Sequence, residues 1–167
     1  MLRNLLFCML AAALPAVPAV AADASSVGAD GTVTIRPGEA FEIAFPDRND
    51  LSHPGFSRAL DHVDDKVAGY RKPDPGAPPQ AGPALMSFEL RNEGAMLELY
   101  VRNDTGVAVK YDATMITKQS DGKLVASHTS VCPSLPGMLG TEMWAETVVS
   151  LKLAKFHKSS DDDLTCE

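Results

Sequence analysis

Positive charge is scarce in this chain of 167 residues, in which 15 Lys and Arg stand against 22 Asp and Glu for a formal charge of −7. Binding to nucleic acid depends on Lys and Arg that neutralise phosphates, so we expect no nucleic-acid partner. The short motifs of common enzymes are missing as well: the sequence contains no G-x-S-x-G, H-E-x-x-H, G-x-x-x-x-G-K-S/T or G-x-G-x-x-G. We therefore expect a protein that is not an enzyme and that carries no cofactor.

Long apolar runs are missing from the chain after its amino-terminal segment. No later stretch approaches the roughly 18 residues of a membrane-spanning helix. Within residues 1–21, Arg3 precedes an apolar run from Leu5 to Leu14, and the small residues of Ala19–Ala21 follow. This pattern predicts a secretory signal peptide over 1–21. We expect export to the periplasm or the medium, and a mature chain with no transmembrane segment. Its charge becomes −8, because 14 Lys and Arg then face 22 Asp and Glu.

Cysteine is also scarce, with three in the chain, and Cys8 lies inside the predicted signal peptide. The other two, Cys132 and Cys166, permit one intramolecular pairing in an oxidising compartment. We predict that they form a disulfide; free thiols or an intermolecular link are the alternatives. Such a bridge fixes the carboxyl-terminal tail and stabilises the fold by about 4 kcal/mol in the chain-entropy description. The spacing is unlike C-x-x-C, so a structural role is expected.

Strand and turn signals fill most of the remaining chain. Residues 22–30 are small and polar and predict a disordered leader. Phe41, Ile43 and Phe45 then alternate with Glu42 and Ala44, which is typical of a half-buried strand. Later strand-like runs follow one another with turns roughly every 8–12 residues. The rhythm predicts a mainly β single domain over 31–167, an antiparallel immunoglobulin-like β-sandwich or small barrel.

An insertion at about 51–83 interrupts this rhythm. Its first part spaces apolar residues at helical intervals, at Phe56, Leu60, Val63, Val67 and Tyr70. This stripe predicts one short amphipathic helix. Five prolines within residues 72–83 then predict an extended loop or linker.

The segment from His128 to Met143 carries the sharpest hint of metal chemistry. In its placement of Cys132 and Met138, the segment resembles the copper-binding loop of the cupredoxins. The histidine expected between them is missing, and the predicted disulfide would occupy Cys132. His128, Met138 and Met143 remain as candidate ligands, while core packing of the methionines is the favoured interpretation. Acidic groups at 61–65 and 161–163 are read as solvated, with a hard cation or Zn²⁺ as the alternative for the first group and Ca²⁺ as the alternative for the second.

The leading hypothesis is an exported, non-enzymatic binding or accessory structural module of the cell envelope or the secreted fraction, with another protein as its partner. One alternative is a metal-handling protein for copper or calcium. The other is a secreted hydrolase inhibitor, whose binding loop would be Ser134–Met138 beside the disulfide. Asn103-Asp104-Thr105 forms a glycosylation sequon, but Asn and Asp as turn formers explain it fully, and this is the favoured interpretation.

Overall fold

The computed structural model describes residues 24–64, 66, 82–94, 96–160 and 163–166. These residues form strands and connecting loops, and no helix is present among them. The strands are β1 (Ser26–Val27), β2 (Val33–Ile35), β3 (Glu39–Phe45), β4 (Gly55–Leu60), β5 (Ala84–Glu93), β6 (Met96–Asn103), β7 (Val109–Lys118), β8 (Leu124–Thr129), β9 (Leu139–Trp144) and β10 (Val148–Lys158).

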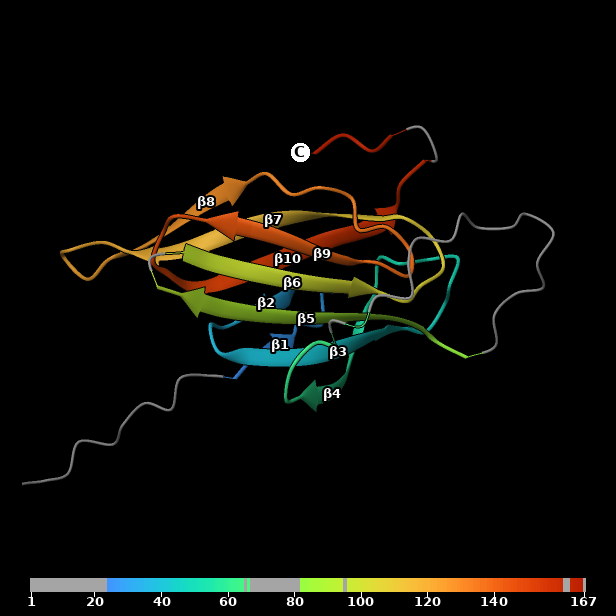
Figure 1. Ribbon diagram of the computed structural model, residues 1–167. Helices are drawn as coiled ribbons and strands as arrows, with labels where there is room; N and C mark the ends of the chain where they lie inside the picture. Colours follow the sequence, from blue (N-terminus) through green and yellow to red (C-terminus); the bar gives the residue numbers. More distant parts are fainter. Residues whose placement is uncertain (1–23, 65, 67–81, 95, 161–162, 167) are drawn as a thin grey trace, which may run out of the picture.

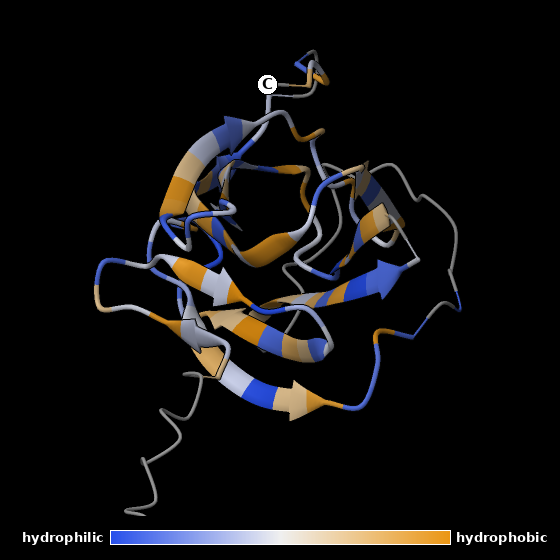
Figure 2. Ribbon diagram, turned by 90° about the vertical axis from the view of Figure 1, so that its left-hand side faces the viewer, coloured by the Kyte–Doolittle hydropathy of each residue, from blue (hydrophilic) through white to orange (hydrophobic). Residues whose placement is uncertain are grey.

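Two antiparallel five-stranded sheets face each other (Figure 1). Sheet A has the strand order β1-β2-β10-β7-β8, and sheet B has the order β4-β3-β5-β6-β9. Figure 2 shows the alternation of hydrophobic and hydrophilic residues along the strands that this arrangement requires. The mainly β, sandwich-like prediction is therefore confirmed, whereas the helix is not found.

The core between the sheets is built from the inward positions of the long strands. Phe88 of sheet B meets Tyr111 and Phe156 of sheet A, with ring centroids 6.3 Å away in both cases. Phe45 packs edge-on against Phe156 at 5.7 Å. Full burial of one such side chain stabilises the fold by about 1.5–3 kcal/mol. Aromatic contact between the two layers therefore fixes how they face each other.

The predicted helix beginning at Phe56 is wrong, because Gly55–Leu60 form the edge strand β4 beside β3. Phe56 stacks on Phe41 with centroids 5.9 Å apart, and the Arg58 guanidinium pairs with the Glu42 carboxylate at 3.1 Å. Pairing with β3 satisfies a whole row of backbone groups, and this outweighs a helical spacing of only a few apolar residues. The rest of the predicted stripe from Val67, and residues 72–81 of the proline-rich segment, lie outside the described residues.

The predicted disorder of the leader is also wrong for its described part. Ser26 and Val27 pair with Thr34 and Val33 of β2. The Ser25 backbone N–H and hydroxyl both donate to the Glu39 carboxylate. Local composition gave no sign of this, because the partners lie on other strands. The predicted signal peptide, residues 1–21, lies outside the described residues.

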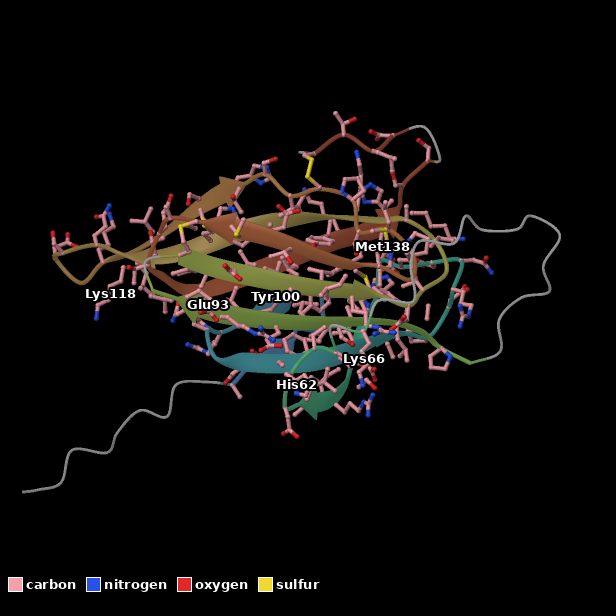
Figure 3. The ribbon with its side chains drawn as sticks, in the orientation of Figure 1. His62, Lys66, Glu93, Tyr100, Lys118 and Met138 are labelled. Carbon is pink, nitrogen blue, oxygen red and sulfur yellow. A yellow bond between two sulfur atoms is a disulfide. The ribbon has the colours of Figure 1, made fainter. Side chains whose placement is uncertain are left out.

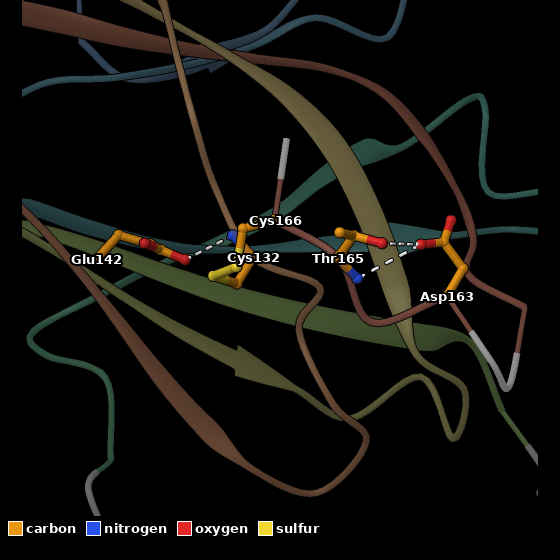
Figure 4. The surroundings of a disulfide bond; sticks show 5 residues. All are labelled: Cys132, Glu142, Asp163, Thr165 and Cys166. Atoms are coloured by element: carbon orange, nitrogen blue, oxygen red, sulfur yellow. Dashed lines mark hydrogen bonds between the residues drawn. A yellow bond between two sulfur atoms is a disulfide. The ribbon is translucent and has the colours of Figure 1, made fainter.

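The carboxyl-terminal tail folds back onto the sandwich (Figure 4). The sulfur atoms of Cys132 and Cys166 are 1.95 Å apart, at disulfide-bonding distance, as the sequence analysis expected. The buried ammonium group of Lys110 on β7 lies 2.7 Å from the Asp163 carboxylate. The hydroxyl of Thr165 donates to the same carboxylate at 2.6 Å. The tail is thus held at two points.

The tail contact is expected to depend on pH. Hydrogen bonds from Lys110 and then Thr165 lower the pKa of Asp163 from 3.8 to about 2. A carboxyl group with a depressed pKa stabilises the folded state above its unfolded pKa, and that stabilisation is lost as the pH falls through the folded pKa. We expect the contact to weaken between pH 3.8 and about 2, and Asp163→Asn to remove this dependence. An NMR titration of the carboxyl group measures it, and a midpoint at the ordinary value would contradict it.

Candidate functional site

The outer face of sheet A is hollowed into a shallow groove of about 510 Å³. A row of side chains crosses all five strands here, because Ser26 is opposite Thr34, Lys152 lies between Thr34 and Thr114, and Thr114 is opposite His128. The groove is lined by Ser26, Gly28, Asp30, Thr32, Thr34, Thr114, Ile116, Ala126, Lys152 and Ala154. The lining therefore consists mostly of short side chains, with Ile116 and Lys152 as the longer ones.

The groove carries hydroxyl groups and one charge of each sign. The backbone N–H and hydroxyl of Thr32 both donate to the Asp30 carboxylate, at 3.0 and 2.9 Å. These hydrogen bonds lower the pKa of Asp30, and the positive charge of Lys152 adds a smaller effect in the same direction. Asp30 therefore supplies a negative charge to the lining of the groove, and Lys152 supplies a positive one. The arrangement offers donors and acceptors to a polar, extended ligand.

The outer face of sheet B is different, because a chain segment already covers part of it. The Glu89 carboxylate on β5 is buried and accepts the Val63 backbone N–H at 2.7 Å. Arg91 donates to the same carboxylate, which lowers the pKa of Glu89. The Arg91 guanidinium also lies 4.2 Å from the ring centroid of Tyr100, and Arg102 donates to the carbonyl of Lys66 (Figure 3). Glu89 and Arg102 of this face are thus engaged with the backbone of Val63 and Lys66.

The three candidate metal ligands are not brought together. His128 lies on β8 of sheet A, whereas Met143 lies on β9 of sheet B. Met138 directly precedes β9 (Figure 3), so five residues of extended chain, about 16 Å, separate it from Met143. A single ion cannot contact both sulfur atoms at this spacing, so the three candidates do not form one site in this arrangement. Among the described residues, no group of three or more His, Cys, Asp or Glu could hold a metal ion.

The loop expected of an inhibitor is held against the sandwich. Ser134 is buried and exchanges two backbone hydrogen bonds with Val109 of β7, at 2.9 and 3.0 Å. The Gly137 N–H donates to the Asn103 carbonyl at 2.7 Å. An inhibitory loop must project into the cleft of another protein, and these contacts hold this one between the two sheets.

Asn103 has a structural role that the sequence analysis missed. The residue is completely buried, and its amide Nδ2 donates to the carbonyls of Val107 and Ser134 at 2.8 and 2.6 Å. Its amide oxygen accepts the backbone N–H and the hydroxyl of Thr105, at 2.9 and 2.7 Å. Because Nδ2 is the atom to which a glycan would be attached, this sequon cannot be glycosylated in the folded protein.

Comparison with protein-family models, with curated proteins and with solved structures finds no match for this chain. Among the described residues, no helix is long and apolar enough to cross a bilayer. The groove of sheet A is thus the candidate site on its geometry alone. Thr32 and Thr34 at alternate positions indicate a polar strand face, but nothing in the sequence places that face beside Lys152 and Thr114.

Proposed function

We propose that the protein is an exported, non-enzymatic module that binds another protein through the groove of sheet A. The observation that carries this proposal is a groove to which all five strands contribute short or hydroxyl-bearing side chains, with Lys152 among them. Short side chains let the backbone of a partner segment approach the sheet closely. The hydroxyls, Lys152 and Asp30 can then pair with its peptide groups and its charged ends.

Export and the finer fold type belong to the same proposal. The pattern of residues 1–21 supports a signal peptide, and the cysteine pair at bonding distance supports an oxidising compartment, the periplasm or the medium. The two facing antiparallel sheets support an immunoglobulin-like sandwich that forms one domain over 31–167. Such sandwiches commonly present a sheet face to a partner.

Filling the groove is expected to abolish binding. Thr114→Arg places a long charged side chain in the middle of the row, beside Lys152, so a partner segment must lose at least about tenfold in affinity. Thr141→Arg is the matched control, because Thr141 is exposed on β9 of sheet B. We expect Thr141→Arg to alter the free energy of unfolding by no more than about 0.5 kcal/mol, and Thr114→Arg, which faces Lys152, to lower it by no more than about 1 kcal/mol.

The measurement is chemical cross-linking of the mature protein to its own envelope extract, followed by mass spectrometry of the linked partners. The proposal requires that the wild type and Thr141→Arg recover the same partner and that Thr114→Arg loses it. Equal recovery by all three proteins would show that the groove is not the binding surface.

A further inference from the structure

Strand β8 forms an edge of sheet A with unusually little protection. It lies at the margin of the sandwich (Figure 1), and β7 pairs with one side of it; no other strand of the described chain pairs with the opposite side. Its six residues, Leu124–Thr129, include no Asp, Glu, Lys, Arg or Pro, and Leu124 is 55% exposed. An edge of this kind is a template for another strand.

The other three sheet edges each carry a feature that discourages pairing. β1 is only two residues long. β4 has a register shift against β3 and carries Arg58. β9 carries Glu142, whose carboxylate is directed to the backbone N–H of Cys132 at 2.8 Å. Short strands, bulges and charged residues are the usual means of blocking edge-to-edge association, so β8 stands apart.

The direction of the β8 backbone groups follows from the hairpin that precedes it. The Gln119 N–H donates to the Lys123 carbonyl at 2.9 Å, so these two residues form a hydrogen-bonded pair. Such pairs alternate along an antiparallel ladder. Val125, Ser127 and Thr129 therefore bond to β7. The N–H and C=O groups of Leu124, Ala126 and His128 consequently point to the open edge.

We propose that a second copy of this chain pairs with β8 along this edge, antiparallel and about a two-fold axis at Ala126. In this register Ala126 meets its own counterpart, and Leu124 lies opposite His128 of the second copy. All three edge-facing residues of both chains are then hydrogen bonded, whereas a shift by two residues leaves some of them unpaired. The self-complementary register, together with the lack of charge, favours a second copy over an unrelated strand.

Pairing of this kind would join the candidate sites of two copies. This inference rests on the proposed function and goes beyond it, because it adds a second copy to the binding surface. The two copies of sheet A become one continuous sheet. Ala126 lines the groove and also lies on the two-fold axis, so the two grooves join across the interface. A partner segment could then contact both copies. The contact is small for a dimer, so we expect association that depends strongly on protein concentration.

A pair of double variants tests the register directly by sedimentation equilibrium of the mature, disulfide-intact protein. Leu124→Lys with His128→Lys places two lysines opposite each other at both ends of the paired strands, and we expect the dimer to weaken at least about tenfold. Leu124→Glu with His128→Lys changes the same positions but places opposite charges together, and the dimer should persist. Within one chain the two positions are about 13 Å apart, but position 124 lies opposite Lys118 of β7, so the unfolding midpoint of each variant in urea is measured beside its dimer constant to separate monomer stability from association.

A wild-type protein that stays monomeric at all concentrations overturns the proposal, and so do two double variants with equal dimer constants. Thr114→Arg leaves the backbone of β8 intact, so it should dimerise while losing the groove partner. If the wild-type protein is a monomer and the Thr114→Arg variant nevertheless loses the groove partner, the dimer is refuted and the proposed function stands.

Discussion

Asn103→Ala is expected to lower the free energy of unfolding by about 3 kcal/mol or more, because a buried polar group left without its partner costs about 1–3 kcal/mol. The substitution deprives the carbonyl of Ser134 and the backbone N–H of Thr105 of their side-chain partner. Asn103 connects the end of β6 to the loop that precedes β9, so its loss loosens both. Urea-induced unfolding of the mature protein measures the effect.

Two further substitutions make this experiment specific. Asn103→Asp keeps the shape of the side chain but places a carboxylate against the carbonyls of Val107 and Ser134, and it should be at least as destabilising. Asn92→Ala, at an exposed position of β5, is the control and should stay within about 0.5 kcal/mol of the wild type. An Asn103→Ala protein as stable as this control would contradict the assigned role.

Removing the cysteine pair is expected to have an effect of similar size. The linked residues are 34 positions apart, and closing a loop of this length in the unfolded chain corresponds to about 4 kcal/mol in the chain-entropy description. We expect the double variant Cys132→Ser, Cys166→Ser to unfold at a clearly lower urea concentration and to release the tail from β7. Amide hydrogen exchange at residues 163–166 reports that release.

The control for this prediction is the wild-type protein after reduction, which lacks the bond but keeps both side chains. It should match the double serine variant in stability. If both proteins unfold at the same urea concentration as the oxidised wild type, the bond does not stabilise the fold. Asp163→Asn separates the two anchors of the tail, because it removes the ion pair with Lys110 and leaves the cysteine pair in place.

The sheets could be predicted from the sequence where large apolar residues occupy alternate positions of a strand. Phe41, Ile43 and Phe45 alternate with less apolar residues, and the structure places them in β3 with their side chains in the core. Edge strand β4 could not be predicted, because only one of its sides is paired and its few apolar residues also fit a helical spacing. Its conformation is decided by β3, a partner that local periodicity does not reveal.

The groove could not be predicted because it depends on the order of the strands. Thr34, Thr114 and Lys152 are far apart in the sequence, and they form one row only because β10 lies between β2 and β7. The same limit explains the metal prediction. Met138 and Met143 are close in sequence, but an extended strand separates them. Asn103 looked like a turn residue because its burial depends on the loop that returns from β8.

The central claim, that the outer face of sheet A binds another protein, is tested most directly by photo-cross-linking in the exporting cell. A photoreactive amino acid is placed at position 114, in the groove, and in a second protein at position 141, on the outer face of sheet B. The account predicts one dominant cross-linked partner from position 114 and none of that partner from position 141. Cross-linking of the same partner from position 141 alone, or from both positions equally, would contradict it.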